Sequence, residues 1–179
     1  MKRDAAIHAL RTGRRDLQDA LADLTEEDYA RPNAAGKWSL QDVLAYIAAW
    51  DEEIVRVLQT FHLSESIYTY VISDRNDFAA WNEEQVTRRR VQTPAQTLSE
   101  FEGARRDLIQ VVEGLTDAVL NRSRMTAWGK AVTGFELLAL QAERDHANAQ
   151  VARRYRKKRE RWARARKNLN AKRQAKTKD

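Results

Sequence analysis

The sequence contains no cysteine, and this absence excludes disulfide bonds, a thiol nucleophile and a thiolate-bound metal. Six glycines and two prolines among 179 residues are too few for a loop-rich β protein, so the composition favours helices. Glycine motifs that bind phosphates or dinucleotides are also missing. No apolar run approaches the roughly 20 residues of a membrane span, and no signal peptide is recognisable. We therefore expect a cytoplasmic protein with a single helical core.

The net charge of +6 combines two segments of opposite sign. Residues 153–179 contain 14 basic and two acidic residues, a net charge of +12. The other 152 residues contain 18 basic and 24 acidic residues, a net charge of −6. A mildly acidic body therefore carries a strongly basic C-terminal segment.

Apolar residues recur at helical spacing in four long segments: 3–24, 39–60, 94–114, and 134 onward into the basic segment. A shorter helix is predicted over 77–90. Residues 61–74 read as a crossover loop and 116–134 mostly as loop. Capping signals mark three of the helix starts: Ser39 with Asp42, Thr93 before Pro94, and Thr133 with Glu136. Four amphipathic helices without a set of strands predict an all-α bundle.

The second of these helices opens with Lys-Trp-Ser-Leu-Gln-Asp-Val-Leu-Ala-Tyr-Ile-Ala-Ala-Trp-Asp at positions 37–51. This run resembles the second helix of the DinB-like four-helix-bundle superfamily. Weaker likeness comes from Trp81-Asn82 and from the helix that starts at Pro94. The resemblance implies a DinB-like four-helix bundle over 1–155, followed by a basic C-terminal helical extension over 156–179.

In metal-binding members of that superfamily, a histidine stands at the place of Tyr46, and the last helix adds two histidines four residues apart. Here the last helix carries His146, whose neighbours at that spacing are Ala142 and Gln150. Because two of the three ligands are replaced, we expect no metal and no other cofactor. Nearby carboxylates remain as alternative donors: Asp51, Glu52, Glu143 and Asp145.

One branch of the superfamily, which includes a hydrolase that opens strained cyclopropane rings in a genotoxin, is similar at Tyr46, Trp50 and Trp81-Asn82. The resemblance implies that Tyr46 activates water or positions the electrophile, and that Trp50, Trp81 and Asn82 shape a substrate pocket. A phenol with an ordinary pKa near 10 is a poor base at neutral pH, so His146 is expected to assist as a second catalytic residue. The alternative is that Tyr46 and Trp50, one turn apart, are only bundle core.

These residues indicate a metal-independent hydrolase or transferase acting on a small molecule, in detoxification or resistance. The basic segment supports a different function, a non-catalytic bundle that binds nucleic acid or an acidic partner. Its cations alternate with Tyr155 and Trp162, a combination typical of nucleic-acid-binding segments. The residues expected to contact phosphates are Arg154, Arg156, Lys157, Lys158, Arg159 and Arg161. The same segment could instead be a solvated extension, or contact the protein's own acidic body. The sequence gives no sign of membrane binding and leaves a homodimer open.

Overall fold

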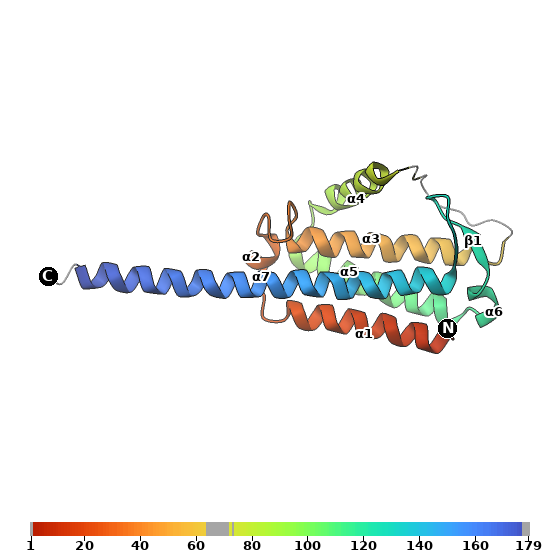
Figure 1. Ribbon diagram of the computed structural model, residues 1–179, viewed down its shortest axis with the longest axis horizontal. Coiled ribbons are helices and arrows are strands. Elements are labelled where there is room, and N and C mark those ends of the chain that lie inside the picture. Colours follow the sequence, from red (N-terminus) through yellow and green to blue (C-terminus); the bar gives the residue numbers. More distant parts are fainter. Residues whose placement is uncertain (1, 64–71, 73, 177–179) are drawn as a thin grey trace.

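A computed structural model describes residues 2–63, 72 and 74–176, most of them helical (Figure 1). Four long helices form the bundle: α1 (Arg3–Leu21), α3 (Leu40–Gln59), α5 (Pro94–Glu113) and α7 (Gly134–Lys176). The most extensive packing joins α1 to α7 and α3 to α5, and smaller contacts between α3 and α7 and between α1 and α5 close the ring. The predicted all-α four-helix bundle is therefore confirmed.

Shorter elements connect the four bundle helices. They are α2 (Glu26–Ala30), α4 (Arg75–Arg89), α6 (Asp117–Leu120), β1 (Ser123–Met125) and β2 (Ala131–Thr133). Helix α4 packs on α3, outside the ring of four (Figure 1). The crossover loop predicted over 61–74 lies largely outside the described residues.

The segment 116–134, predicted mostly as loop, contains α6 and an antiparallel hairpin of β1 and β2. Ser123 pairs with Thr133, and the hydroxyl of Thr126 donates a 2.6 Å hydrogen bond to the carbonyl of Lys130 across the turn. Gly129 adopts φ +73° in this turn, a conformation that favours glycine. Strands this short lack the alternating pattern that reveals a strand in a sequence.

The helix starts follow the predicted capping signals. The hydroxyl of Ser39 accepts a 3.0 Å hydrogen bond from the backbone N–H of Asp42, whose carboxylate accepts one from the N–H of Ser39. The same reciprocal pair joins Thr133 to Glu136. Helix α1 ends at Leu21, three residues earlier than predicted, because Asp23 turns into the left-handed region at φ +66°.

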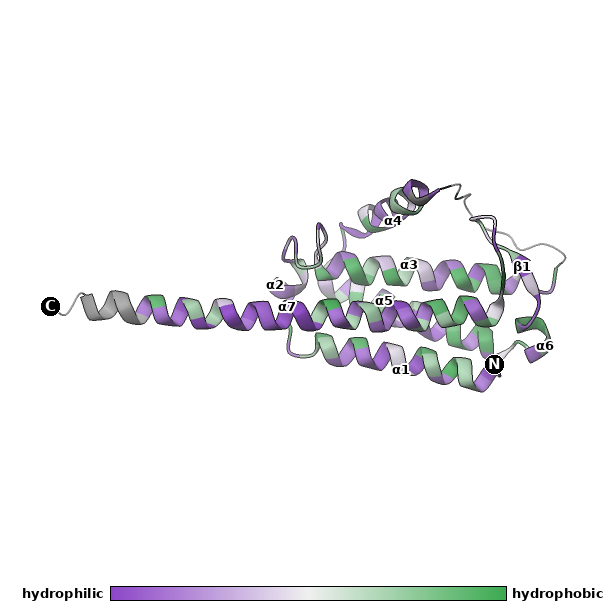
Figure 2. Cartoon of the chain, viewed as in Figure 1, coloured by the Kyte–Doolittle hydropathy of each residue, from purple (hydrophilic) through white to green (hydrophobic). Residues whose placement is uncertain are grey.

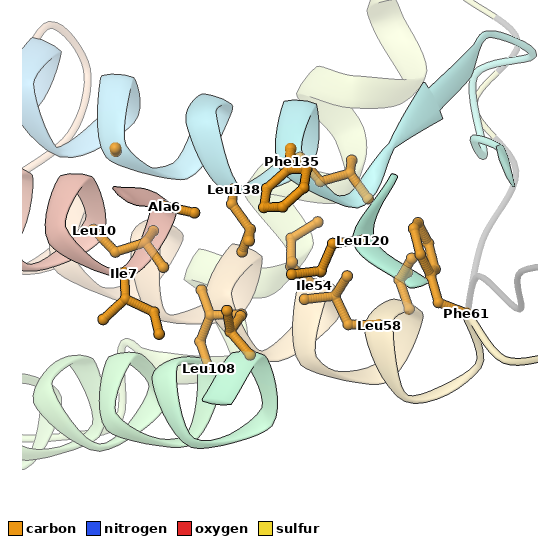
Figure 3. Close-up of a cluster of buried hydrophobic side chains, with 14 of the residues drawn as sticks. Ala6, Ile7, Leu10, Ile54, Leu58, Phe61, Leu108, Leu120, Phe135 and Leu138 are labelled. Atoms are coloured by element: carbon orange, nitrogen blue, oxygen red, sulfur yellow. The ribbon is translucent and has the colours of Figure 1, made fainter. Parts of the chain in front are cut away.

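Two apolar clusters fill the bundle, one toward each end. Figure 3 shows the first, which joins the N-terminal part of α1 to the end of α3, to α5 and to the start of α7. Its labelled members are Ala6, Ile7, Leu10, Ile54, Leu58, Phe61, Leu108, Leu120, Phe135 and Leu138. The second cluster includes Leu17, Leu44, Ile47, Phe101 and Tyr155.

A charged layer separates the two apolar clusters, with one buried residue from each bundle helix. Arg14 of α1 donates to Asp51 of α3 (2.7 Å) and to Asp145 of α7 (3.1 Å). Arg105 of α5 also donates to both carboxylates, at 2.9 Å and 2.8 Å. All four side chains are almost completely excluded from solvent. We call these residues the charged quartet; their formal charges cancel.

Helix α7 continues well beyond the bundle (Figure 1). Its 43 residues correspond to a rod of roughly 65 Å, and the coloured part that extends beyond the bundle is mainly hydrophilic in Figure 2. The helix runs unbroken across the predicted boundary between residues 155 and 156. Within the described residues, no helix combines the length and apolarity needed to cross a bilayer.

Candidate functional site

The candidate site lies on the side of α3 that carries Tyr46 and Trp50, one helical turn apart. Helix α7 contributes Arg144 to this side, and α4 contributes Trp81 and Asn82. Tyr46 is half-buried, whereas Trp50 and Trp81 are buried. We refer to these five residues as the aromatic site.

A single guanidinium holds Tyr46 and Trp50 together. The Nε–H of Arg144 donates a 2.9 Å hydrogen bond to the phenol oxygen of Tyr46. Its guanidinium carbon lies 4.6 Å from the centre of the Trp50 ring and 5.3 Å from that of Tyr46, within the range of a cation–π interaction. Nη1 donates to the side chain of Gln141, and Nη2 makes no hydrogen bond to any residue that the structure describes. One donor of this cation is therefore available to a ligand.

Trp50 connects α3 to α4. Its indole N–H donates a 2.9 Å hydrogen bond to the side-chain oxygen of Asn82, and its ring lies 4.5 Å from that of Trp81. Phe78 and Trp128 extend the apolar surface, with ring centres 6.1 Å from Trp50 and 5.5 Å from Phe78 respectively. The structure thus brings together four of the residues singled out in the sequence, namely Tyr46, Trp50, Trp81 and Asn82.

A second aromatic residue, Trp38, packs against Tyr46 with a ring separation of 5.4 Å. Glu83 of α4 accepts hydrogen bonds from the Trp38 indole N–H at 3.2 Å and from the amine of Lys37 at 2.6 Å. The bond from Lys37, and to a smaller extent that from Trp38, holds the pKa of Glu83 below its usual range. The start of α3 and the helix α4 are therefore joined by an ionised carboxylate beside the aromatic site.

The structure does not bring His146, predicted to assist Tyr46 in catalysis, to Tyr46. His146 is half-exposed and its Nδ1 lies 3.0 Å from a carboxylate oxygen of Asp16 on α1. The reason is the rotation of 100° per residue along α7: with Arg144 facing Tyr46, a residue two positions later points about 200° away. The sequence alone does not identify Arg144 as a site residue, because nothing distinguishes one arginine from the others on a charged helix until the residue that it faces is known.

The side chains of the aromatic site do not fit a divalent metal. The α7 residue that faces Tyr46 is a cation, which repels a metal ion, and one turn later stands Asn148, an amide. Two of the carboxylates considered as replacements, Asp51 and Asp145, are bound by the arginines of the charged quartet. Among residues 2–63, 72 and 74–176, no three His, Cys, Asp or Glu side chains come together as a metal site would require.

The basic part of α7 divides into a docked and a free portion. Arg153, Arg156 and Arg159, three residues apart, form ion pairs with Asp16, Asp23 and Asp28 of the acidic body. Two of the residues expected to contact phosphates, Arg156 and Arg159, are therefore engaged with the protein itself. The other four are exposed and form no ion pair with any described residue: Arg154, Lys157, Lys158 and Arg161.

Asp28 is the centre of the docked portion. It is buried, which disfavours its charge, but hydrogen bonds from the backbone of Thr25, the hydroxyl of Tyr155 (2.8 Å) and Arg159 outweigh burial and lower its pKa to about 2. Burial and the bond to Asp28 raise the pKa of Tyr155 to about 12. The two side chains thus form a fixed donor–acceptor pair across the physiological range.

Comparison with known proteins gives one family and several structural neighbours. The sequence pattern of the DinB superfamily matches residues 9–146. The mycothiol-dependent maleylpyruvate isomerase superposes with a TM-score of 0.72 at 13% identity, over 85% of this chain and 61% of the isomerase chain. The present chain therefore spans about three-fifths of the length of the isomerase. No curated protein matches the sequence.

Two further neighbours match over most of both chains. The colibactin self-resistance protein ClbS, solved in complex with double-stranded DNA, has a TM-score of 0.74 at 12% identity, over 87% of this chain and 96% of that one. YfiT from Bacillus subtilis is described as a probable metal-dependent hydrolase with an unusual four-helix bundle topology. It has a TM-score of 0.65 at 18% identity, over 87% of this chain and 86% of the YfiT chain. At these identities the likeness establishes a shared fold.

Proposed function

Because this chain belongs to the DinB superfamily, we propose that it is a metal-independent hydrolase or transferase for a small organic molecule, active in detoxification or resistance. The observation that carries the proposal is the hydrogen bond from Arg144 to Tyr46 beside the rings of Trp50 and Trp81, which pack against each other at an angle of 55°. Arg144 takes the role of partner to Tyr46 that the sequence analysis gave to His146. The neighbours of the same fold support a small-molecule reaction, since they include an isomerase, a self-resistance protein and a probable hydrolase.

The hydrogen-bond direction determines what Tyr46 can do. Its oxygen accepts from Arg144, so its own proton is left for another acceptor. A bond received from a cation polarises the phenol and strengthens the bond that it donates. Tyr46 is therefore suited to donate to an oxygen atom that gains negative charge as a bond to carbon breaks, and the available Nη2 of Arg144 is suited to stabilise that charge.

The surrounding residues indicate the class of substrate. Trp50, Trp81 and Phe78 form an apolar cluster of tilted aromatic rings, and the only cation among the residues that form the aromatic site is Arg144. A planar or strained ring that carries an oxygen leaving group or a carboxylate would satisfy both features. The side-chain oxygen of Asn82 accepts a hydrogen bond from the indole of Trp50, so the amide N–H groups of Asn82 point away from that indole.

The experiment compares wild-type protein with Tyr46→Phe and Arg144→Gln on a panel of an epoxide, a cyclopropane-bearing alkylating agent and an activated ester, with and without a thiol. Turnover without the thiol identifies a hydrolase, and dependence on the thiol identifies a transferase. Each substitution is expected to lower kcat/KM by about 100-fold or more, the typical contribution of a positioned proton donor. The matched control is Glu143→Gln, an exposed neighbour on α7. Turnover that survives both substitutions would refute the proposal.

The metal-independence has its own test. Elemental analysis of untagged protein purified without chelator is expected to show no stoichiometric zinc, nickel or manganese, and adding these ions should leave Tm unchanged, because a ligand that binds the folded state raises Tm. One bound equivalent of metal that disappears on replacing His146 by alanine would contradict the proposal.

The exposed cations of α7 favour a second candidate function, binding of nucleic acid by the bundle as an adaptor. Among the described residues, the cations from Arg161 to Lys167 form no ion pair with the acidic body, and Arg164 pairs only with Glu160 of the same helix. The neighbour ClbS was solved in complex with double-stranded DNA. The test is a variant with Gln at Arg161, Arg164, Arg166 and Lys167, which keeps the helix but removes four charges. The logarithm of the binding constant falls with the logarithm of the salt concentration, and this slope should be shallower in the variant than in wild type. The difference should be up to about 0.9 for each phosphate that the variant no longer neutralises. No binding by wild-type protein at low salt would refute this function.

A further inference from the structure

A groove lies where the extension of α7 leaves the bundle. It is bounded by Arg31, just after α2, and by one face of α7 that includes Arg159, Trp162, Arg166, Lys167 and Asn170. Its volume is about 590 Å³, and no acidic residue is among those that line it. We call it the Trp162 groove. It lies on a different part of the molecule from the aromatic site, and none of the residues of that site lines it.

Trp162 is exposed but held in place. The residue keeps 42% of its surface in solvent. The ring of Tyr155 meets it edge-on, at 6.5 Å and 81°, and Tyr155 is itself fixed by the hydrogen bond to Asp28. The cations of Lys158 and Arg31 lie 4.8 Å and 5.4 Å from the ring centre. An indole that is oriented before binding loses little freedom when a ligand stacks on it.

The cations of the groove differ in availability. Arg31 is paired with Glu27 at 2.8 Å and Arg159 with Asp28, so both serve mainly to shape the groove. Arg166 and Lys167 make no ion pair or hydrogen bond within the part of the chain that the structure describes. Arg166 follows Trp162 by four residues and therefore lies on the same face of the helix, one turn further on. A flat ring with an available cation beside it is thus presented to solvent.

We propose that the Trp162 groove binds single-stranded nucleic acid, with one base stacked on Trp162 and the neighbouring phosphates on Arg166 and Lys167. This inference rests on the second candidate function and assigns its partner. A single strand presents the faces of its bases, whereas a duplex buries them between neighbouring pairs, so an exposed indole favours the single strand. Cations alone would bind either form through phosphates.

The test measures the affinity of the full chain for an oligothymidylate of about 12 nucleotides and for a duplex of the same length, at about 0.15 M salt. Trp162→Ala is expected to weaken binding of the single strand by about tenfold or more, and Trp162→Phe by less, because phenylalanine retains a ring that can stack. Binding of the duplex should change little in either variant. Circular dichroism checks that the helix is intact.

The matched pair Arg166→Ala and Arg161→Ala separates the groove from the general charge of the helix. Both remove one arginine from the same stretch of α7, but only Arg166 lines the groove. Arg166→Ala should therefore weaken binding of the single strand several-fold more than Arg161→Ala. Equal losses in the two variants, or unchanged affinity in Trp162→Ala, would overturn the stacking site while leaving the second candidate function intact. Tighter binding of the duplex, insensitive to Trp162, would assign a duplex partner instead. No binding of either form at low salt would overturn both.

Discussion

At the scale of single residues, Arg144 and His146 show how two positions on one helix come to face different environments. Arg144 stacks on Trp50 and donates to Tyr46, whereas His146 faces α1 and contacts Asp16. Asp16 also binds Arg153, and the bond from Arg153 followed by that from His146 keeps the pKa of Asp16 below its usual range. His146 is therefore a minor member of the contact between α1 and α7.

This difference makes His146→Ala an informative variant. We expect the free energy of unfolding to change by no more than about 0.5 kcal/mol, because the imidazole that is removed is half-exposed and Arg153 still pairs with Asp16. Activity on any substrate found with the panel should be retained, whereas Arg144→Gln should lose it. Urea unfolding and steady-state kinetics check the two expectations. An intact His146→Ala protein without activity would restore the catalytic role predicted from the sequence.

Asp28 predicts a loss of stability in acid. Its pKa in the folded protein is about 2, below the value of about 4 in an unfolded chain. A depressed carboxyl pKa stabilises the folded state above the unfolded value, and this contribution disappears as the pH falls from about 4 to 2. The loss amounts to about 2 kcal/mol. Urea unfolding from pH 6 downward should therefore show a shallower acid decline in Asp28→Asn than in wild type. Equal slopes of unfolding free energy against pH in the two proteins would contradict a lowered pKa of Asp28.

At the scale of secondary-structure elements, α1 approaches α7 closely at Gly13. A methyl group added to Gly13 would lie 2.8 Å from the carbonyl oxygen of Ala142 and 3.3 Å from Cβ of Asp145. The first of these contacts is to backbone, which cannot rotate away. Glycine at position 13 is therefore a requirement of helix packing, and it sits beside Arg14 of the charged quartet.

We expect Gly13→Ala to destabilise the protein by about 1–3 kcal/mol, although alanine is the better helix former, because the two helices must separate. The control is Gly103→Ala on α5, where an added methyl group would meet only Nη2 of Arg106 at 3.7 Å. There the helix propensity of alanine should dominate and raise the stability by up to about 1 kcal/mol. Thermal unfolding of the two variants measures the difference, and equal changes in Tm would contradict the argument that Gly13 is required for helix packing.

Elements with local signals could be predicted from the sequence. Ser39 with Asp42 and Thr133 with Glu136 act within one helical turn, so their pattern in the sequence is also their geometry. The hairpin of β1 and β2 could not be predicted, because its strands are three residues long. In the candidate site, Tyr46 and Trp50 belong to one helix and carry a recognisable pattern. Their partner Arg144 lies 98 residues from Tyr46, and its placement depends on the rotation of α7, which no local pattern specifies.

At the scale of the whole molecule, the charged quartet fixes the four bundle helices relative to one another. Each carboxylate binds both arginines, so any helix that rotates or slides breaks at least two ion pairs. Buried charges are costly unless all are paired, and therefore this layer rejects alternative registers that the two apolar clusters alone would accept. The rotation of α7 that places Arg144 at Tyr46 is set in part by its neighbour Asp145.

The quartet predicts a large effect of removing one charge. Asp51→Asn leaves two buried arginines with a single carboxylate, and we expect a loss of about 3–5 kcal/mol in the free energy of unfolding. Arg88→Gln removes an exposed ion pair with Glu84 on α4 and should cost no more than about 0.5 kcal/mol. Urea denaturation at neutral pH compares the two. A mild effect of Asp51→Asn would show that the layer tolerates a missing charge.

The extensive packing of α1 on α7 has a consequence for the time course of synthesis. The buried side of α1 is covered by residues as distant as Tyr155, which pairs with Asp28 next to it. At about 5–20 residues per second, a ribosome needs roughly 7 to 27 s to proceed from the end of α1 to Tyr155. During that interval α1 lacks its main partner α7, although α3 and α5 can already pair and α5 offers α1 a smaller contact. The nascent chain therefore completes its bundle late, and Asp16, Asp23 and Asp28 receive their arginine partners only after α7 has been made.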